Sequence, residues 1–238
     1  MGRPAPHGAL AAALRRLARI VRPAVSATRQ VVLASASPAR LSLLRQAGIE
    51  PVVRVSGVDE DSLADALERE GRASPAEICA ALAHAKALAV TDAVRAELPA
   101  SVVVGCDSVL DLDGVALGKP DDAVDAVNRW RAMRGRTGIL RTGHSVVRLG
   151  ATSAQDRVAS AVASTLVVFA DLDDATIDAY VATGEPLHVA GAFTLDGIGG
   201  AFVERIDGDP ANVVGLSLPL VRRLFADLDV AWTSLWSV

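Results

Sequence analysis

The chain has 238 residues, of which 51% are hydrophobic and 22% are charged. A chain of this length and composition buries a sizeable core, which excludes a largely disordered protein and fits one large domain or two small lobes. Charged residues or glycines interrupt every long apolar segment, so the sequence predicts no membrane span. Two cysteines, Cys79 and Cys106, lack CxxC or Cys/His spacing. They argue against a disulfide framework and a zinc site and favour a reducing, cytoplasmic location.

The first 30 residues differ in charge from the rest of the chain. They contain six arginines and no acidic residue, although the net charge of the whole chain is −4. We expect residues 1–30 to form a basic arm, disordered or a short amphipathic helix, and residues 31–238 to form one domain. Arginines within the apolar part and the lack of an A-x-A site argue against a secretory signal. Two alternatives for residues 1–30 are a start codon placed too early and a segment that contacts a membrane or a nucleic acid. We expect no stable nucleic-acid partner.

From Val31 onward, apolar runs alternate with capped helical segments. Strands are predicted over 31–36, 51–56, 101–110, 139–149, 158–169 and 202–206, and helices over 38–46, 75–98, 121–133, 173–184 and 214–228. Ser74 and Glu77 form a capping box for the second helix, and an acidic loop precedes it at 59–61. The alternation predicts an α/β fold: a mixed sheet with flanking helices, in two lobes around a cleft.

Lysine is rare in this chain, which favours arginine. Of 24 basic residues only Lys86 and Lys119 are lysines, so both are candidates for a compact charge that meets a phosphate or a carboxylate. Lys86 falls within the apolar stripe of the helix over 75–98, where a charge must pair, face a cavity or extend to the helix edge. Lys119 lies in GVALGKP, whose glycine spacing and following proline exclude a Walker motif.

Asp107 ends the apolar run SVVVGCD, near the expected carboxyl end of a strand, where open α/β sheets place ligand chemistry. A turn-forming aspartate explains the same pattern equally well. The DLDG turn that follows predicts a hairpin that could bring Lys119 beside Asp107. Glu60 lies between two aspartates in a carboxylate cluster that suits a hard cation, although such loops are usually just solvated.

The stretch LASASPARLSLLRQAG begins a helix directly after a strand. Ser35, Ser37 and Arg40 could hold a phosphate there, because a helix N-terminus presents free N–H groups and arginine adds a fork of donors. Ser37 as a plain N-cap explains the same residues without a ligand.

Taken in chain order, these motifs resemble the Maf family of nucleoside triphosphate pyrophosphatases. The matching segments are 33–48, 58–60 (VDE), 82–87 (LAHAKA), 105–109 (GCDSV), 118–120 (GKP), 185–191 (EPLHVAG) and 213–216 (VVGL). The resemblance covers residues 31 to about 228. It implies a fold similar to that of the inosine triphosphate pyrophosphatases, a catalytic domain over 31–238, and cleavage between the α and β phosphates of a nucleoside triphosphate.

The resemblance also implies residue roles and a cofactor. Asp107 would activate water, and Lys86 and Lys119 would neutralise phosphate charge. Glu60, with Asp107, would bind a divalent cation, Mg²⁺ or Mn²⁺. The triphosphate would be held by Ser35, Ser37 and Arg40. A homodimer is one assembly compatible with the resemblance.

The sequence departs from the family pattern at two places. Ala39 replaces the first arginine of the family's S-P-R-R, so one phosphate or base contact is absent. The segment around Asp196 lacks the lysine and glutamine typical of members that cleave dTTP and UTP, and it is nearer to members acting on 7-methyl-GTP. A different hypothesis is a regulator of cell division that binds a nucleotide without hydrolysing it.

Overall fold

The computed structural model describes residues 29–237. The basic arm expected over residues 1–30 lies outside the described residues, except for its last two. Within 29–237 no helix has both the length and the apolar character needed to cross a membrane.

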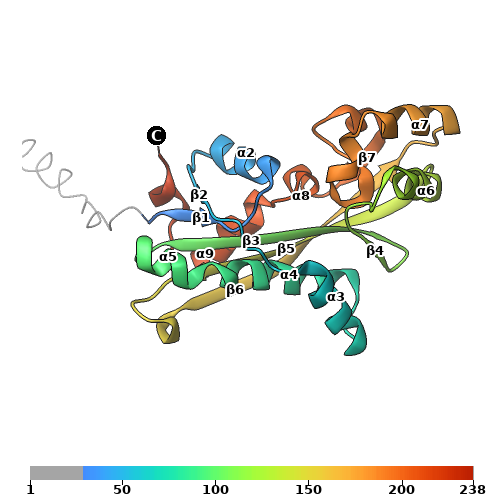
Figure 1. The fold of residues 1–238 in the computed structure, drawn as a ribbon. Helices are drawn as coiled ribbons and strands as arrows, with labels where there is room; N and C mark the ends of the chain where they lie inside the picture. Colours follow the sequence, from blue (N-terminus) through green and yellow to red (C-terminus); the bar gives the residue numbers. More distant parts are fainter. Residues whose placement is uncertain (1–28, 238) are drawn as a thin grey trace, which may run out of the picture.

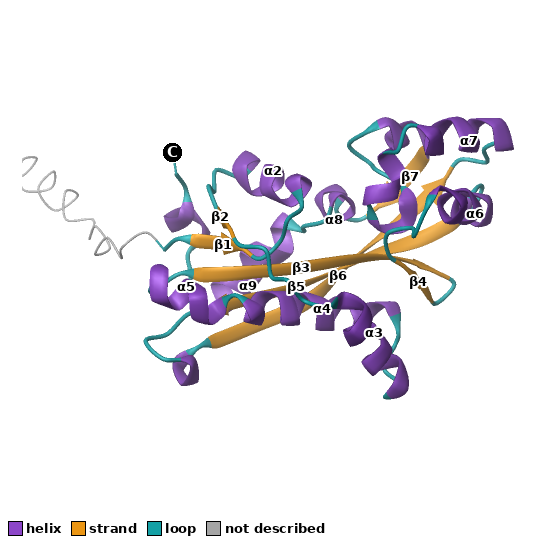
Figure 2. Ribbon diagram, viewed as in Figure 1, coloured by secondary structure: helices purple, strands orange, loops and turns teal. Residues whose placement is uncertain are grey.

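One mixed, seven-stranded sheet runs through the described part of the chain (Figures 1 and 2). Its strand order is β2-β1-β3-β5-β6-β7, and β4 pairs with β3 outside this path. β1 pairs in parallel with β2 and β3, and the other pairs are antiparallel. The strands are β1 (Val31–Leu33), β2 (Val52–Val53), β3 (Val102–Leu112), β4 (Val115–Leu117), β5 (Thr137–Arg148), β6 (Arg157–Phe169) and β7 (Val203–Asp207). The predicted mixed α/β fold is confirmed.

Helices cover both faces of this sheet. The α-helices are α2 (Pro38–Gln46), α3 (Glu60–Arg69), α4 (Pro75–Ala89), α5 (Thr91–Glu97), α6 (Ala123–Met133), α7 (Asp174–Ala182), α8 (Pro210–Val214) and α9 (Leu218–Asp227). Short 3₁₀ helices are η1 (Ser153–Gln155), η2 (Glu185–His188), η3 (Ala190–Ala192), η4 (Ile198–Phe202) and η5 (Trp232–Leu235). In Figure 1, α3 to α5 lie below β3, whereas α2, α8, α6 and α7 lie above it.

The buried residues form three apolar clusters around the sheet. One joins β1 and the first half of β3 to α2 and α9. A second joins the far ends of β3 and β5 to α6 and α7, and the ring of Trp130 meets Phe169, Tyr180 and Phe202 edge to face there. The third lies between the sheet and α4 with α5. The long strands β3 and β5 therefore carry the first and third clusters on opposite faces at one end of the sheet and the second cluster at the other end.

Four predicted elements differ in the structure. The helix over 75–98 is interrupted at Val90, where α4 ends and α5 begins. The acidic loop is the start of α3, because the Asp59 side chain accepts a hydrogen bond from Ser62 N and caps the helix. The final helix, predicted over 214–228, begins only at Leu218, as α9. Val214 instead ends a separate helix, α8, which stops at Gly215, whose φ of 126° is incompatible with a continuous helix. The strand predicted over 51–56 is only two residues long.

Candidate active site

Asp107 lies where one edge of β3 has no strand partner. β1 pairs with Val102 to Val104, and β4 pairs with Leu110 to Leu112, so neither strand covers residues 105–109. Asp107 therefore lies in the middle of β3, not near its carboxyl end as predicted. β1, the parallel neighbour of β3, ends at Leu33 opposite Val104. Asp107 therefore lies just beyond the carboxyl end of β1, where open α/β sheets place ligand chemistry.

Two glycines allow α4 to lie very close to the sheet. A Cβ atom on Gly105 would lie 2.3 Å from the Ala83 carbonyl oxygen, and one on Gly143 would lie 2.1 Å from the Cys79 carbonyl oxygen. Gly143 is also the partner of Asp107 in the β3–β5 register. Because neither glycine has a side chain, the helix backbone approaches the strands directly and places one of its side chains, Lys86, against Asp107.

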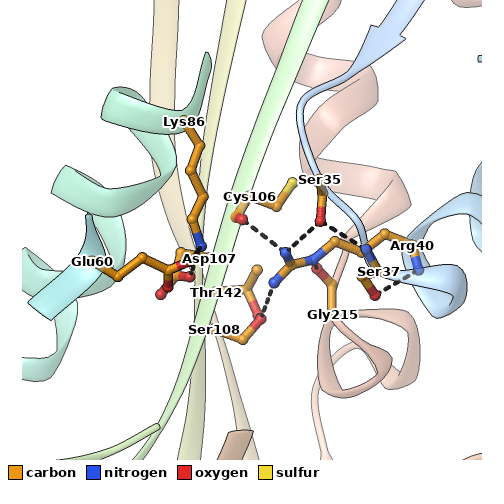
Figure 3. A network of polar contacts seen from close by, with 10 residues as sticks. All are labelled: Ser35, Ser37, Arg40, Glu60, Lys86, Cys106, Asp107, Ser108, Thr142 and Gly215. Atoms are coloured by element: carbon orange, nitrogen blue, oxygen red, sulfur yellow. Dashed lines mark hydrogen bonds and ion pairs between the residues drawn. The ribbon is translucent and has the colours of Figure 1, made fainter. Parts of the chain in front are cut away.

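Lys86 is held between two carboxylates (Figure 3). Its Nζ lies 2.6 Å from Asp107 Oδ1 and 2.8 Å from Glu60 Oε1. Asp107 is 6% exposed and Lys86 8%, whereas the Glu60 side chain is half exposed. Burial raises the pKa of Asp107, and the charges of Lys86 and Arg40 oppose this shift. The site therefore holds a desolvated carboxylate whose charge is balanced by a lysine.

Arg40 fills the gap on the β1 side of β3 (Figure 3). Its Nη1 donates to the Cys106 carbonyl oxygen at 2.8 Å and to Ser35 Oγ at 3.1 Å. On the β1 side of β3, the last backbone hydrogen bond runs from Ala34 N to Val104 O. Arg40 donates to the next carbonyl oxygen of β3 on that side, which belongs to Cys106. Arg40 is thus engaged by the protein itself.

Ser35 and Ser37 both stabilise the turn into α2. Ser35 Oγ accepts a hydrogen bond from Ser37 N at 3.2 Å, and Ser37 Oγ accepts one from Arg40 N at 3.3 Å as the helix N-cap. The structure therefore brings together Ser35, Ser37 and Arg40 as predicted from the sequence. Their contact with a triphosphate stays a prediction.

Lys119 and Asp196 are both exposed. Lys119 follows β4 by two residues, and the antiparallel pair Leu117 and Leu110 directs this chain segment back toward Asp107. The predicted hairpin is thus present. Asp196 lies in the loop before η4, beside the second core. Within residues 29–237 neither side chain forms a hydrogen bond or an ion pair, and no direct contact joins either residue to Asp107.

The family described as Maf-like protein matches residues 30–228. The chain belongs to this family. It is 57% identical over 209 residues to a protein of Streptomyces avermitilis, an overlap of 88% of this chain and 95% of the relative. It is 56% identical to one from Salinispora tropica, covering 87% and 88%, and 51% identical to one from Cutibacterium acnes, covering 87% and 94%. Each relative is named nucleoside triphosphate pyrophosphatase.

The Maf-like chain also has a buried polar network that sequence reasoning missed. Thr142 Oγ1 lies 2.9 Å from Ser108 Oγ, which in turn accepts from Arg40 Nη2 at 3.1 Å. Thr142 Oγ1 also donates to Asn212 O at 3.2 Å. Thr142 and Asn212 are fully buried. Polar residues at inward positions of a strand, as in RTGHSVV, are the signal that could have indicated this network.

Glu185 is a second residue that the sequence alone did not single out for a role. Its carboxylate accepts hydrogen bonds from Tyr180 Oη, Thr194 Oγ1 and the backbone N–H groups of Ile198 and Gly199. These bonds hold the pKa of Glu185 below its usual value against the opposing effect of burial. The segment 194–199, which carries Asp196, is thereby fixed to the start of η2.

The carboxylates of the Maf-like site suit a hard divalent cation. Glu60 and Asp107 direct oxygen atoms at one point, which the Lys86 ammonium fills, so a cation is already stabilised there. Among the described residues no group of three or more His, Cys, Asp or Glu side chains could enclose a metal. Two carboxylates completed by phosphate oxygens and water are a typical Mg²⁺ environment, so the donor set fits that ion better than an ion that needs an all-protein cage.

Proposed function

We propose that this chain hydrolyses a nucleoside triphosphate between its α and β phosphates. Water attacks the α-phosphorus, the bond from that phosphorus to the oxygen bridging to the β-phosphate breaks, and a nucleoside monophosphate and pyrophosphate leave. The observation that carries the proposal is the buried Asp107 carboxylate, bound to Lys86 at an uncovered edge of β3. The name shared by the relatives supports the same reaction.

Asp107 is the general base of this reaction. It accepts the proton of the attacking water, and its raised pKa makes it a stronger base than an exposed aspartate. Lys86 and Lys119 neutralise charge on the phosphates as the bond breaks. Ser35, Ser37 and Arg40 would hold the triphosphate at the start of α2, where the helix dipole favours negative charge.

A divalent cation, Mg²⁺ or Mn²⁺, belongs to the proposal. Glu60 and Asp107 would hold it, and it would neutralise phosphate charge and polarise the phosphate oxygens. Lys86 then keeps the two carboxylates close together in the absence of the ion.

The substrate in this proposal is a modified nucleotide, with 7-methyl-GTP as the first candidate. Asp196 supplies a carboxylate that can accept hydrogen bonds from the N–H groups of a guanine base.

The proposed location of the reaction is the cytoplasm. Cys79 and Cys106 are free and buried, and burial raises the pKa of Cys106 to about 11, so the thiol next to Asp107 is no nucleophile.

The test is pyrophosphate release from a panel of ordinary and modified nucleoside triphosphates with Mg²⁺ or Mn²⁺. We expect turnover of at least one nucleotide and a loss of about 100-fold or more in Asp107→Asn, because an amide cannot accept the proton. Asp92→Asn, an exposed aspartate on α5, is the matched control and should keep full activity.

A panel without turnover, or an Asp107→Asn variant as active as the wild type, would contradict the proposal. Tight nucleotide binding without any product would instead favour the regulator of cell division.

A further inference from the structure

The loop that carries Lys119 is fixed on both sides by residues of α6. Before Lys119, the carbonyl oxygen of Gly118 accepts a hydrogen bond from Arg129 Nη1 at 2.7 Å. After it, Asp121 N donates to Asp125 Oδ2 at 3.0 Å. Arg129 Nη2 and Asp125 Oδ2 lie 2.7 Å apart, one helical turn from each other. A single ion pair therefore holds both ends of a four-residue loop.

This ion pair is partly shielded from water. The side chains of Arg129 and Asp125 are 15% and 31% exposed, and the hydrogen bond from Arg129 keeps the pKa of Asp125 below its usual value. The guanidinium binds the carbonyl with one NH₂ group and the carboxylate with the other, a fork that lysine cannot reproduce. The contact restrains the loop more than an exposed ion pair would.

The backbone of the loop is fixed while the ammonium of Lys119 stays free. Gly118 O accepts a second hydrogen bond, from Gly191 N at 2.9 Å, and Pro120 is buried. Lys119 itself is exposed and makes no polar contact within residues 29–237. The antiparallel pairing of β4 with β3 turns this chain segment back toward the part of β3 that carries Asp107. A side chain presented in this way, from a rigid loop with a free charge, is arranged to meet a ligand.

We propose that Arg129, through its ion pair with Asp125, is a positioning residue for Lys119. The inference rests on the proposed function, because Lys119 acts there on phosphate charge. Arg129 touches no substrate in this account. It fixes the backbone from which the ammonium reaches the phosphates, and small displacements of such groups reduce rates strongly.

A double-mutant cycle tests the inference. Pyrophosphate release is measured, with the nucleoside triphosphate that the wild type cleaves fastest, for Arg129→Ala, Lys119→Ala and the double variant. We expect Arg129→Ala to lower kcat/KM by about tenfold to 100-fold, mainly through kcat. In the Lys119→Ala background the same change should cause no further loss, because no ammonium remains to be positioned. An equal loss in both backgrounds, or wild-type activity in Arg129→Ala, would overturn the inference.

Two further variants complete the design. Arg131→Ala removes a different ion pair of α6, in which Arg131 Nη2 lies 3.1 Å from Asp174 Oδ2. This variant should keep wild-type kcat/KM. If Arg129→Ala fails to fold in a thermal unfolding scan, the cycle is run with Arg129→Lys, which keeps the charge and loses the fork, with the same expected pattern. A wild type that cleaves no nucleotide contradicts the proposed function, whereas equal losses in an active enzyme contradict this inference alone.

Discussion

Arg40 binds the protein with all three of its guanidinium nitrogens. Besides its contacts with Ser35, Cys106 and Ser108, its Nε donates to the Gly215 carbonyl oxygen at 2.8 Å. These partners come from β3, from the turn after β1 and from the connection between α8 and α9. One planar side chain therefore ties together three segments that are distant in the sequence, and a lysine could satisfy only part of this set.

We expect Arg40→Lys to destabilise the fold by about 1–3 kcal/mol, because at least one of the carbonyl oxygens of Cys106 and Gly215 loses its donor in a part-buried site. Urea unfolding measures the change. The control is Arg45→Lys on the same helix, whose ion pair with Glu50 is exposed and should change stability by less than about 1 kcal/mol. Equal effects of the two substitutions would contradict this role for Arg40.

The position of helix α4 decides whether Lys86 reaches Asp107. The helix can lie against β3 and β5 only because Gly105 and Gly143 present no side chain beneath it. Helix propensity and capping by Ser74 place the helix in the sequence, but the two glycines set its distance from the sheet. The ion pair in the site therefore depends on residues that carry no functional group.

We expect Gly143→Ala to destabilise the protein by at least about 1–3 kcal/mol, because the new Cβ would overlap the α4 backbone at Cys79. Pyrophosphate release should fall as well, since α4 must move and take Lys86 away from Asp107. Gly118→Ala, where a Cβ would meet nothing within 4 Å, is the control for urea unfolding and should be close to neutral. A fully stable and active Gly143→Ala variant would refute this account of the packing.

At the scale of the whole molecule, one buried histidine links the sheet to the C-terminal helices by hydrogen bonds. His144 on β5 is 1% exposed. Its Nδ1–H donates to the Thr142 carbonyl oxygen at 2.9 Å, and its Nε2 accepts from Ser217 N, the N-cap of α9, at 2.9 Å. Burial lowers the pKa of His144 to about 4, with help from the charge of Arg40 and against the weaker effects of the hydrogen bond to Thr142 and the charge of Asp209. The imidazole is therefore neutral in the folded protein.

Stability should fall as the pH is lowered below the pKa of an ordinary histidine, about 6.5, and toward 4. In that window the unfolded chain binds a proton at His144 and the folded chain does not. The expected loss is about 2 kcal/mol between pH 7 and pH 5, measured by urea unfolding. In His144→Gln this part of the pH dependence should disappear, whereas His188→Gln, at an exposed histidine, should keep it. An unchanged pH dependence in His144→Gln would show that His144 is not its source.

Much of the fold followed from local patterns in the sequence. Ser37 with Pro38, and Ser74 with Glu77, marked two helix starts that the structure confirms, because capping involves residues only a few positions apart. The start of α3 was wrongly predicted as a loop, although Asp59 caps it by the same mechanism. The break at Val90 was missed because both α4 and α5 have a helical pattern on their own.

The sequence by itself determined which residue types are available for the site: an aspartate in an apolar strand, two rare lysines and a serine-rich helix start. Only the tertiary structure decided their arrangement. Arg40 meets Cys106 and Gly215, which lie 66 and 175 positions away, and Lys86 meets Asp107 only because Gly143 allows α4 to approach. Capping and periodicity act over a few residues, whereas strand pairing and helix packing join residues that no local pattern relates.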